Sequence, residues 1–319
     1  MGERAARLAN YILLVAALFL GGAAPPPTKP TPELYGAGLF STGAWDFFMA
    51  FSPDERRALF CRANDSFTVF QIYETRRDPG GPWRAPTVPR FAGTWSNADP
   101  HFTVDGRKVY FISNRPGPGQ KGAQPTMDIW YASLDSKGEW GNAVRVPEPV
   151  SEPGIDEWSP SVAANGNLYF GTERPTGFGA NDLWVARWNG TSYDSLANLG
   201  DSINTDRGEV EPWIAPDESY LIFSGRGRTD GVGGFDLYMS RRENGKWTKA
   251  RPIEAINTKA LEFNQSVSPD GQWLYFSSTR PHEGSLGERL DVPRNDSTVV
   301  GIGKGTGDIY RIPVRAIGL

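Results

Sequence analysis

The sequence SPDGQWLYFSSTR, from Ser268 to Arg280, decides the fold. Its Pro-Asp-Gly turn stands between two apolar runs. Proline fixes φ at the first turn position and glycine accepts the positive φ that tight turns require, so the segment predicts a β-hairpin.

Comparable segments recur along the chain. Their turn residues are 51 to 60 positions apart, at Asp54, Asp105, Asn165, Asp217 and Asp270. After each hairpin comes an Asp-aliphatic-aromatic triplet or, in the first copy, Gln71-Ile-Tyr73. A third element opened by an aromatic residue then follows. Short strands repeated at this period are typical of the four-stranded blades of a β-propeller.

We therefore predict an all-β chain with a single five-bladed propeller over residues 33–319, built from four-stranded antiparallel blades. The sequence ends soon after Asp308-Ile-Tyr310, which leaves the last copy without a fourth strand. The stretch Leu39–Asp46 resembles Ile256–Glu262, so we expect an N-terminal strand to complete the last blade and remove an exposed sheet edge. Six blades are the alternative, if Pro32–Leu39 and residues 281–306 hold further strands.

Composition limits the chemistry. The 319 residues include 37 Gly, 26 Pro and 12% aromatic residues, which fits a turn-rich β protein and excludes a disordered chain. The only histidines are His101 and His282, so a three-histidine metal site is excluded. Cys61 is the only cysteine, which excludes an intrachain disulfide and predicts a buried, inert thiol. The net charge of −4 argues against a nucleic-acid partner.

The N-terminus has the pattern of a secretory signal. Arg4 and Arg7 precede an apolar run and a small-residue end, which predicts a signal peptide over residues 1–24. Residues 25–32 are rich in proline and predict an extended linker. We expect a periplasmic or secreted monomer with no membrane span after cleavage.

The repeats resemble those of TolB-type, WD-like propeller proteins of the bacterial cell envelope. The residues that carry the resemblance are Ser268–Arg280 and the sequence GGFDLY from Gly233 to Tyr238. Residues 174–184 are also similar to propeller repeats joined to peptidoglycan-binding domains. The resemblance implies the propeller fold. We expect neither the N-terminal α/β domain of TolB nor a peptidoglycan-binding domain here, so those proteins' partners are not carried over.

Residue types that recur in every repeat are expected to be structural. We predict charge-assisted contacts between recurrent arginines and recurrent aspartates. The arginines are Arg115, Arg174, Arg226 and Arg280, and the aspartates are Asp128, Asp182, Asp236 and Asp308.

The first strand of each repeat is expected to line a central channel, with every second residue facing it. Strand alternation places the rows of Phe47 and Phe51 together on the opposite face. Three rings of channel residues follow. The first is Asp46, Asn97, Glu157, Glu209 and Glu262; the second is Phe48, Asp99, Ser159, Glu211 and Asn264; the third is Ala50, His101, Ser161, Trp213 and Ser266.

These rings predict an acidic channel mouth. The candidate ligand-binding residues are Asp99, His101, Glu157, Glu209, Glu211, Trp213 and Glu262. We predict an exported, non-catalytic binding scaffold whose partner is an envelope protein or a glycan and which needs no cofactor. The ligand surface is the channel mouth with loops 116–126 and 281–306, and residues 283–305 are the favoured partner contact.

Two alternatives remain open. The first is a five-bladed glycoside hydrolase that uses the carboxylates of Asp46, Asp99 and Glu211. The second is a calcium-binding propeller, because oxygen-rich rings suit Ca²⁺. A Ser-His-Asp hydrolase is excluded because the sequence has no Gly-x-Ser-x-Gly elbow. The glycine-rich run Gly301–Gly307 is expected to be a connector rather than a phosphate loop.

Overall fold

The fold is described from a computed structural model of the chain, which describes residues 29–281 and 306–319. The chain divides into two compact units, Met1–Pro30 and Thr31–Leu319. The second unit holds the strands described below. The predicted signal peptide, the contact predicted at 283–305, and His282 lie outside the described residues.

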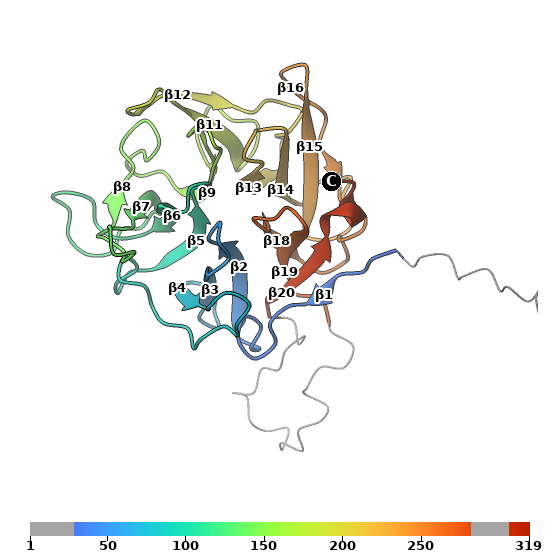
Figure 1. The fold of residues 1–319 in the computed structure, drawn as a ribbon. Coiled ribbons are helices and arrows are strands. Elements are labelled where there is room, and N and C mark those ends of the chain that lie inside the picture. Colours follow the sequence, from blue (N-terminus) through green and yellow to red (C-terminus); the bar gives the residue numbers. More distant parts are fainter. Residues whose placement is uncertain (1–28, 282–305) are drawn as a thin grey trace, which may run out of the picture. The chain divides into compact units, whose positions relative to one another are not determined.

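Five antiparallel sheets stand around a central channel, and their first strands β2, β5, β9, β13 and β18 surround it (Figure 1). Blade 1 contains β2 (Trp45–Phe51), β3 (Arg57–Ala63) and β4 (Phe70–Arg76). Blade 2 contains β5 (Asn97–Phe102), β6 (Lys108–Ser113), β7 (Asp128–Ser133) and β8 (Val144–Arg145). Blade 3 contains β9 (Glu157–Val162), β10 (Leu168–Thr172), β11 (Asp182–Trp188) and β12 (Tyr193–Asn198).

Blade 4 contains β13 (Gly208–Ile214), β14 (Tyr220–Arg226), β15 (Phe235–Glu243) and β16 (Lys246–Trp247), with β17 (Arg251–Pro252) also paired to β15. Blade 5 contains β18 (Glu262–Val267), β19 (Trp273–Ser278) and β20 (Asp308–Pro313), followed by the short 3₁₀ helix η2 (Val314–Ile317). In blade 1 the fourth position is reduced to an isolated bridge between Glu74 and Thr87. The predicted five-bladed all-β fold is confirmed.

The N-terminal strand β1 (Glu33–Leu34) completes blade 5, as predicted. It pairs antiparallel with β20, and the backbone N–H of Tyr35 donates to the Ile309 carbonyl at 2.8 Å. The Arg311 guanidinium also contacts the Glu33 carboxylate at 2.7 Å. The ring is therefore tied shut by residues almost 280 positions apart, and β20 has no free edge along this pairing.

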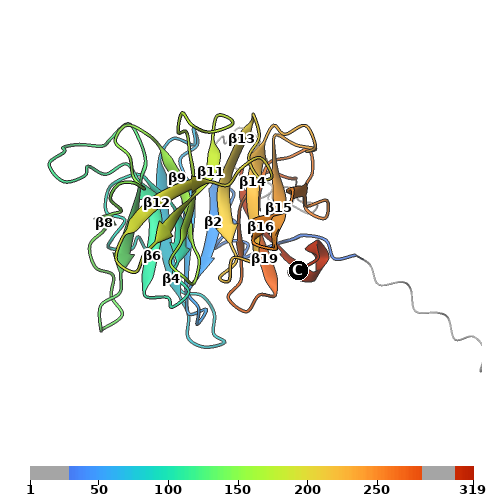
Figure 2. The ribbon, with the colours of Figure 1, turned by 90° about the horizontal axis from the view of Figure 1, so that it is seen from above.

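Blades 1 to 4 each have two kinds of hairpin, which project from opposite ends of their strands (Figure 2). The Pro-Asp-Gly type of turn joins the first and second strands, and we call this end of the ring the first-hairpin face. The loops between the second and third strands lie at the other end, the second-hairpin face.

Every first strand contains a β-bulge at its second-ring residue. Between Phe47 and Met49 the pairing of β2 with β3 slips by one residue, and the other four blades slip at the same place. The residues at the five bulges have left-handed φ angles of 50° to 57°: Phe48, Asp99, Ser159, Glu211 and Asn264. A non-glycine residue in this region costs roughly 1–2 kcal/mol, so the ring of bulges must be held by its surroundings.

The bulges correct one prediction about the strand faces. Strict alternation would place Phe47 and Phe51 on the same face of the sheet. The extra residue at Phe48 reverses the alternation, so Phe47 packs in the cluster shared with blade 2, whereas Phe51 packs against Phe40 and Tyr275 beside blade 5.

Large buried side chains fill the space between blades. Among the described residues, Tyr169, Tyr238, Tyr310, Phe60 and Phe223 are fully buried. Within residues 29–281 and 306–319, no helix is long and apolar enough to cross a membrane.

Candidate functional site

The first ring is buried and holds the blades together. Asp46, Asn97, Glu157, Glu209 and Glu262 are each 0% exposed. Each accepts a hydrogen bond from an arginine in the same blade. The pairs are Arg62–Asp46 at 2.5 Å, Arg115–Asn97 at 2.6 Å, Arg174–Glu157 at 3.3 Å, Arg228–Glu209 at 3.1 Å and Arg280–Glu262 at 3.0 Å. The prediction that this ring forms an acidic channel mouth is therefore wrong, because its side chains are buried and the four carboxylates among them are bonded to arginine.

The same pairs correct the predicted partners of the recurrent arginines. Arg115, Arg174 and Arg280 bond the first ring rather than the recurrent aspartates. Asp128 instead pairs with Arg145, through two bonds of 2.7 and 2.9 Å. Asp182 and Asp236 accept backbone N–H groups from the loops that precede them. Asp308 is also buried.

In blade 4 the arginine of the pair is Arg228, not the predicted Arg226, which is exposed. Gly225 explains the shift, since a Cβ at this position would lie 2.5 Å from the Arg228 Cδ. The absent side chain therefore leaves the space through which Arg228 reaches Glu209.

Asp46, the third carboxylate of the glycoside hydrolase alternative, has different hydrogen-bond partners from Asp99 and Glu211. Its Oδ2 accepts the N–H and the hydroxyl of Thr42 at 2.6 and 2.7 Å, and its Oδ1 accepts the Arg62 guanidinium. Asp46 therefore belongs to the structural first ring, and Asp99 and Glu211 remain as the candidate pair.

Asp99 and Glu211 lie in the second ring, where their carboxylates join neighbouring blades. Asp99 Oδ2 accepts the Ser159 hydroxyl at 2.6 Å, which connects blade 2 to blade 3. Glu211 Oε2 accepts the Asn264 N–H at 2.8 Å, which connects blade 4 to blade 5, and also the Ser224 hydroxyl at 2.6 Å. Glu211 accepts both of these hydrogen bonds through Oε2, and Oε1 takes part in neither.

The channel raises the pKa of both carboxylic acids. Burial raises the pKa of Asp99 to about 6, although the bonds from Ser159 oppose the shift. Burial raises the pKa of Glu211 to about 7, and the nearby charge of Asp99 adds to this shift. The two groups therefore sense each other and titrate close to neutral pH, as acid–base groups in enzymes often do.

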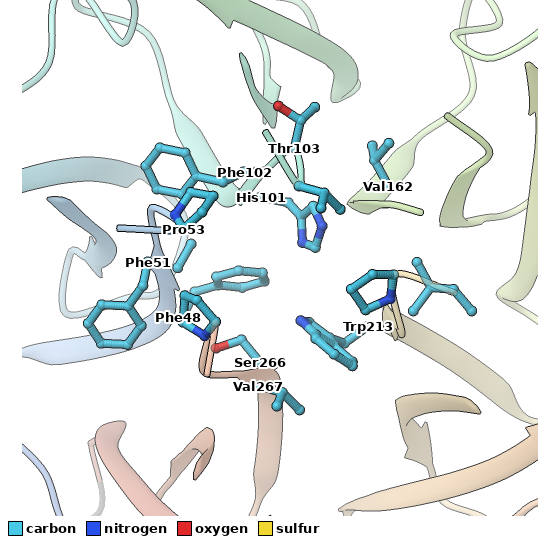
Figure 3. A pocket seen from close by; sticks show the side chains of 15 residues that line it. Phe48, Phe51, Pro53, His101, Phe102, Thr103, Val162, Trp213, Ser266 and Val267 are labelled. Carbon is cyan, nitrogen blue, oxygen red and sulfur yellow. The ribbon is translucent and has the colours of Figure 1, made fainter. Parts of the chain in front are cut away.

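Four of the five third-ring residues line a cavity of about 150 Å³ at the centre of the first-hairpin face: Ala50, His101, Trp213 and Ser266. We call it the central pocket. Figure 3 shows Phe48, His101 and Trp213 directed into it from three blades, with Ser266 beside them. Burial lowers the pKa of His101 to about 4, against the effect of a hydrogen bond with the Val162 backbone. His101 is therefore a neutral imidazole at physiological pH.

The predicted ligand residues are thus divided by the fold. His101 and Trp213 line the central pocket, and Asp99 and Glu211 lie one ring deeper. Glu157, Glu209 and Glu262 are buried in arginine pairs. Residues 116–126 join the second and third strands of blade 2, so they lie at the second-hairpin face, away from the central pocket.

Sequence reasoning missed the apolar contribution to this pocket. Phe48 was expected in the second ring of channel residues but not among the candidate ligand residues, and its side chain enters the pocket beside His101 and Trp213. Prolines of the first hairpins, Pro53, Pro216 and Pro269, form the rim. Their recurrence with the turns was the available signal.

The described residues contain no group of three or more His, Cys, Asp or Glu side chains arranged to hold a metal ion. Cys61 is buried, as predicted, and its thiol pKa is raised well above the ordinary value by burial and by the nearby Asp99.

Comparison with known proteins supports the fold. No family model matches the chain. The α-L-arabinofuranosidase from Lactobacillus brevis superposes with a TM-score of 0.51 at 11% identity, over 88% of this chain and 92% of that one. A thermostable family-43 glycoside hydrolase superposes with a TM-score of 0.52 at 13% identity, over 76% of this chain and 86% of that one.

Two curated relatives are similar in sequence. The chain is 26% identical over 248 residues to "Uncharacterized peptidase YuxL" of Bacillus subtilis (strain 168), which covers 76% of this chain and 31% of that protein. It is 28% identical over 142 residues to "Uncharacterized protein Atu1656" of Agrobacterium fabrum (strain C58 / ATCC 33970), which covers 44% of this chain and 39% of that protein. The matches therefore span about a third of the length of these relatives.

These comparisons correct the predicted function. Two structures that share the fold over most of their length are glycoside hydrolases, and one relative carries a peptidase name, so the comparisons contradict the prediction of a non-catalytic scaffold. At 11% and 13% identity the structural likeness establishes a five-bladed β-propeller and no more.

Proposed function

We propose that the protein is a glycoside hydrolase in which Glu211 and Asp99 form the acid–base pair. The observation that carries the proposal is the pair itself. Asp99 and Glu211, from blades 2 and 4, each stand two positions before a residue that lines the central pocket, His101 and Trp213, and the charge of Asp99 raises the pKa of Glu211.

The different surroundings of the two acids assign their roles. Glu211 has a pKa of about 7, so it keeps its proton near neutral pH and donates it to the leaving glycosidic oxygen. Asp99 has a lower pKa of about 6 and two contacts from Ser159 that favour its anion. It therefore serves the opposite face of the sugar, as the base for water or as the nucleophile.

The central pocket supports a sugar as the bound group. Phe48 and Trp213 present aromatic surfaces, while the neutral His101 and the Ser266 hydroxyl, which donates to the Met49 carbonyl, are polar groups that carry no charge. A site of mostly apolar walls with a few polar groups is the usual form of a small-ligand pocket.

The test is release of reducing ends from neutral oligosaccharides by the purified chain. We expect Glu211→Gln and Asp99→Asn to lower kcat by about 100-fold or more, because each removes one partner of the proton transfer. Both substitutions keep an oxygen that accepts the bonds between blades. Glu139→Gln is the matched control, since the Glu139 side chain is 63% exposed and should leave the rate unchanged.

Thermal unfolding of each variant separates loss of chemistry from loss of fold. Full activity in folded Glu211→Gln, or no hydrolysis of any neutral oligosaccharide by the wild-type chain, would contradict the proposal.

We also propose that the chain is exported through its N-terminal signal and acts on glycan of the cell envelope or the medium as a monomer. The signal-like residues Arg4 and Arg7, with the apolar run after them, support export. The resemblance of Ser268–Arg280 to TolB-type repeats supports the envelope setting. Fractionation of the producing cells with an antibody against the chain tests this location.

A further inference from the structure

We propose that the first-hairpin face carries one continuous groove that binds a linear, uncharged polysaccharide chain, with the central pocket as its midpoint. This inference deepens the proposed function and rests on it for the class of ligand. It adds that the ligand is a polymer seated across the ring, rather than a single sugar held at the centre.

The groove leaves the central pocket along the boundary between blades 5 and 1. Pro53 and Pro269 line both the central pocket and a cavity of about 510 Å³. That cavity in turn shares Glu55, Arg77 and Asp270 with one of about 140 Å³. The shared lining residues place these two cavities side by side, and we take them together as one arm of the groove, which we call the 5–1 arm.

A second arm leaves the central pocket along the boundary between blades 2 and 3. Thr103, Val104 and Val162 line both the central pocket and a cavity of about 400 Å³. We call this cavity the 2–3 arm. Two blades separate the boundaries on one side of the ring and three on the other, so the arms leave the centre in nearly opposite directions.

The walls of both arms match an uncharged ligand. Four acidic and four basic residues line them, which leaves no net charge. The acidic residues are Asp54, Glu55, Asp105 and Asp270, and the basic residues are Arg56, Arg77, Lys108 and Arg311. A polyanion or a polycation would gain little from such walls, because attraction at one residue is offset by repulsion at the next. The hydroxyl groups of a neutral glycan accept and donate bonds to both kinds of side chain.

Each arm also holds an indole at its wall. Trp273 is half-buried in the 5–1 arm, where the Arg311 guanidinium lies 4.1 Å from its ring centre. Trp188 is half-buried in the 2–3 arm, with its ring 5.0 Å from that of Tyr193. Both rings are thereby fixed before a ligand arrives, which lowers the entropy lost when a sugar stacks on them.

The experiment is equilibrium binding of neutral linear oligosaccharides of increasing length to the Glu211→Gln chain, followed by calorimetry. Turnover is then suppressed while the groove is intact. We expect the affinity to rise with chain length until both arms are filled. We expect Trp273→Phe and Trp188→Phe each to weaken binding of the longest ligand by about three- to tenfold, since the smaller ring loses part of the stacking contact.

The control is Phe178→Ala. Phe178 is 53% exposed in the loop between β10 and β11, on the second-hairpin face, so its loss should leave the affinity unchanged. Affinity that does not grow beyond a disaccharide would overturn the groove, as would equal binding by both tryptophan variants. Preferential binding of an extended peptide over every glycan would overturn the ligand class.

The two proposals fail separately. If wild-type protein hydrolyses short glycosides but affinity does not depend on ligand length, the groove is wrong and the acid–base pair stands. If long glycans bind in the groove and none is cleaved, the acid–base pair is wrong and the groove stands.

Discussion

Asp99 and Glu211 occupy the same structural position as Phe48, Ser159 and Asn264, in a bulge that all five blades share. All five blades therefore share the strained backbone at this position, whereas only blades 2 and 4 have a carboxylate there. In blade 5 the hydroxyl oxygen of Ser277 accepts the N–H of Phe48 in the next blade at 3.1 Å. In blades 4 and 2 a carboxylate takes over this contact to the next blade, Glu211 with Asn264 and Asp99 with Ser159. The five blades share this backbone geometry but differ in sequence, and in two of them an acid stands at a position where burial raises its pKa.

The pKa of Asp99 predicts how stability depends on pH. The folded protein holds this proton more tightly than the unfolded chain, because burial raises the pKa from 3.8 to about 6. Stability from this group is therefore present at low pH and is lost as pH rises from about 4 to about 6. We expect Asp99→Asn to be more stable than wild type by about 1–3 kcal/mol at pH 8 and to gain less at pH 4.

Urea unfolding of both proteins at the two pH values measures this difference. Equal denaturation midpoints at pH 8 would mean that the Asp99 carboxylate is not destabilised by its site.

At the scale of the elements, β1 has only two residues yet closes the ring. Besides its pairing with β20, it positions Tyr35 against Phe40, with ring centres 5.4 Å apart, and against Tyr275 at 4.9 Å. A chain that begins at Gly36 would lose these contacts and expose the edge of β20.

We expect such a chain to unfold at least about 5 °C lower than one that begins at Thr31, and to form soluble oligomers through the free edge. Differential scanning calorimetry and light scattering on the two chains provide the comparison. If both unfold at the same temperature as monomers, β1 does not close the ring in solution.

The elements also show what sequence patterns can and cannot predict. The blades were predictable because a Pro-Asp-Gly turn has local causes, and its spacing repeats. The bulges were not, because left-handed residues such as Phe48 and Ser159 carry no glycine signal. The predicted partners of the arginines were also wrong. In blade 4 even the arginine differs, since Arg228 reaches Glu209 through the space left by Gly225.

The candidate site was predictable only in part for the same reason. His101 and Trp213 were selected because they vary between repeats, and the fold brings both into one pocket. Burial decides the rest. The first-ring carboxylates have the residue types of a binding site, but their arginine partners lie in the second strand of the blade or just after it, which a pattern within one strand does not reveal.

At the scale of the whole molecule, the two ends of the channel differ in chemistry. Toward the second-hairpin face, the first ring is buried, and its four carboxylates are paired with arginine. Toward the first-hairpin face, the central pocket opens between Pro53, Pro216 and Pro269, and Asp99 and Glu211 stand two positions before its lining residues His101 and Trp213. The proposed chemistry therefore has one side of approach, and that side is the one with the groove.

The sharpest test of Asp99 and Glu211 as the acid–base pair is the pH dependence of kcat/KM for a neutral oligosaccharide. We expect a narrow bell with limbs near pH 6 and pH 7, from the pKa values of Asp99 and Glu211 as a coupled pair. We also expect residual activity in Asp99→Asn to lose the acidic limb. Absence of hydrolysis, or a profile that Asp99→Asn and Glu211→Gln leave unchanged, would contradict this role of the two acids.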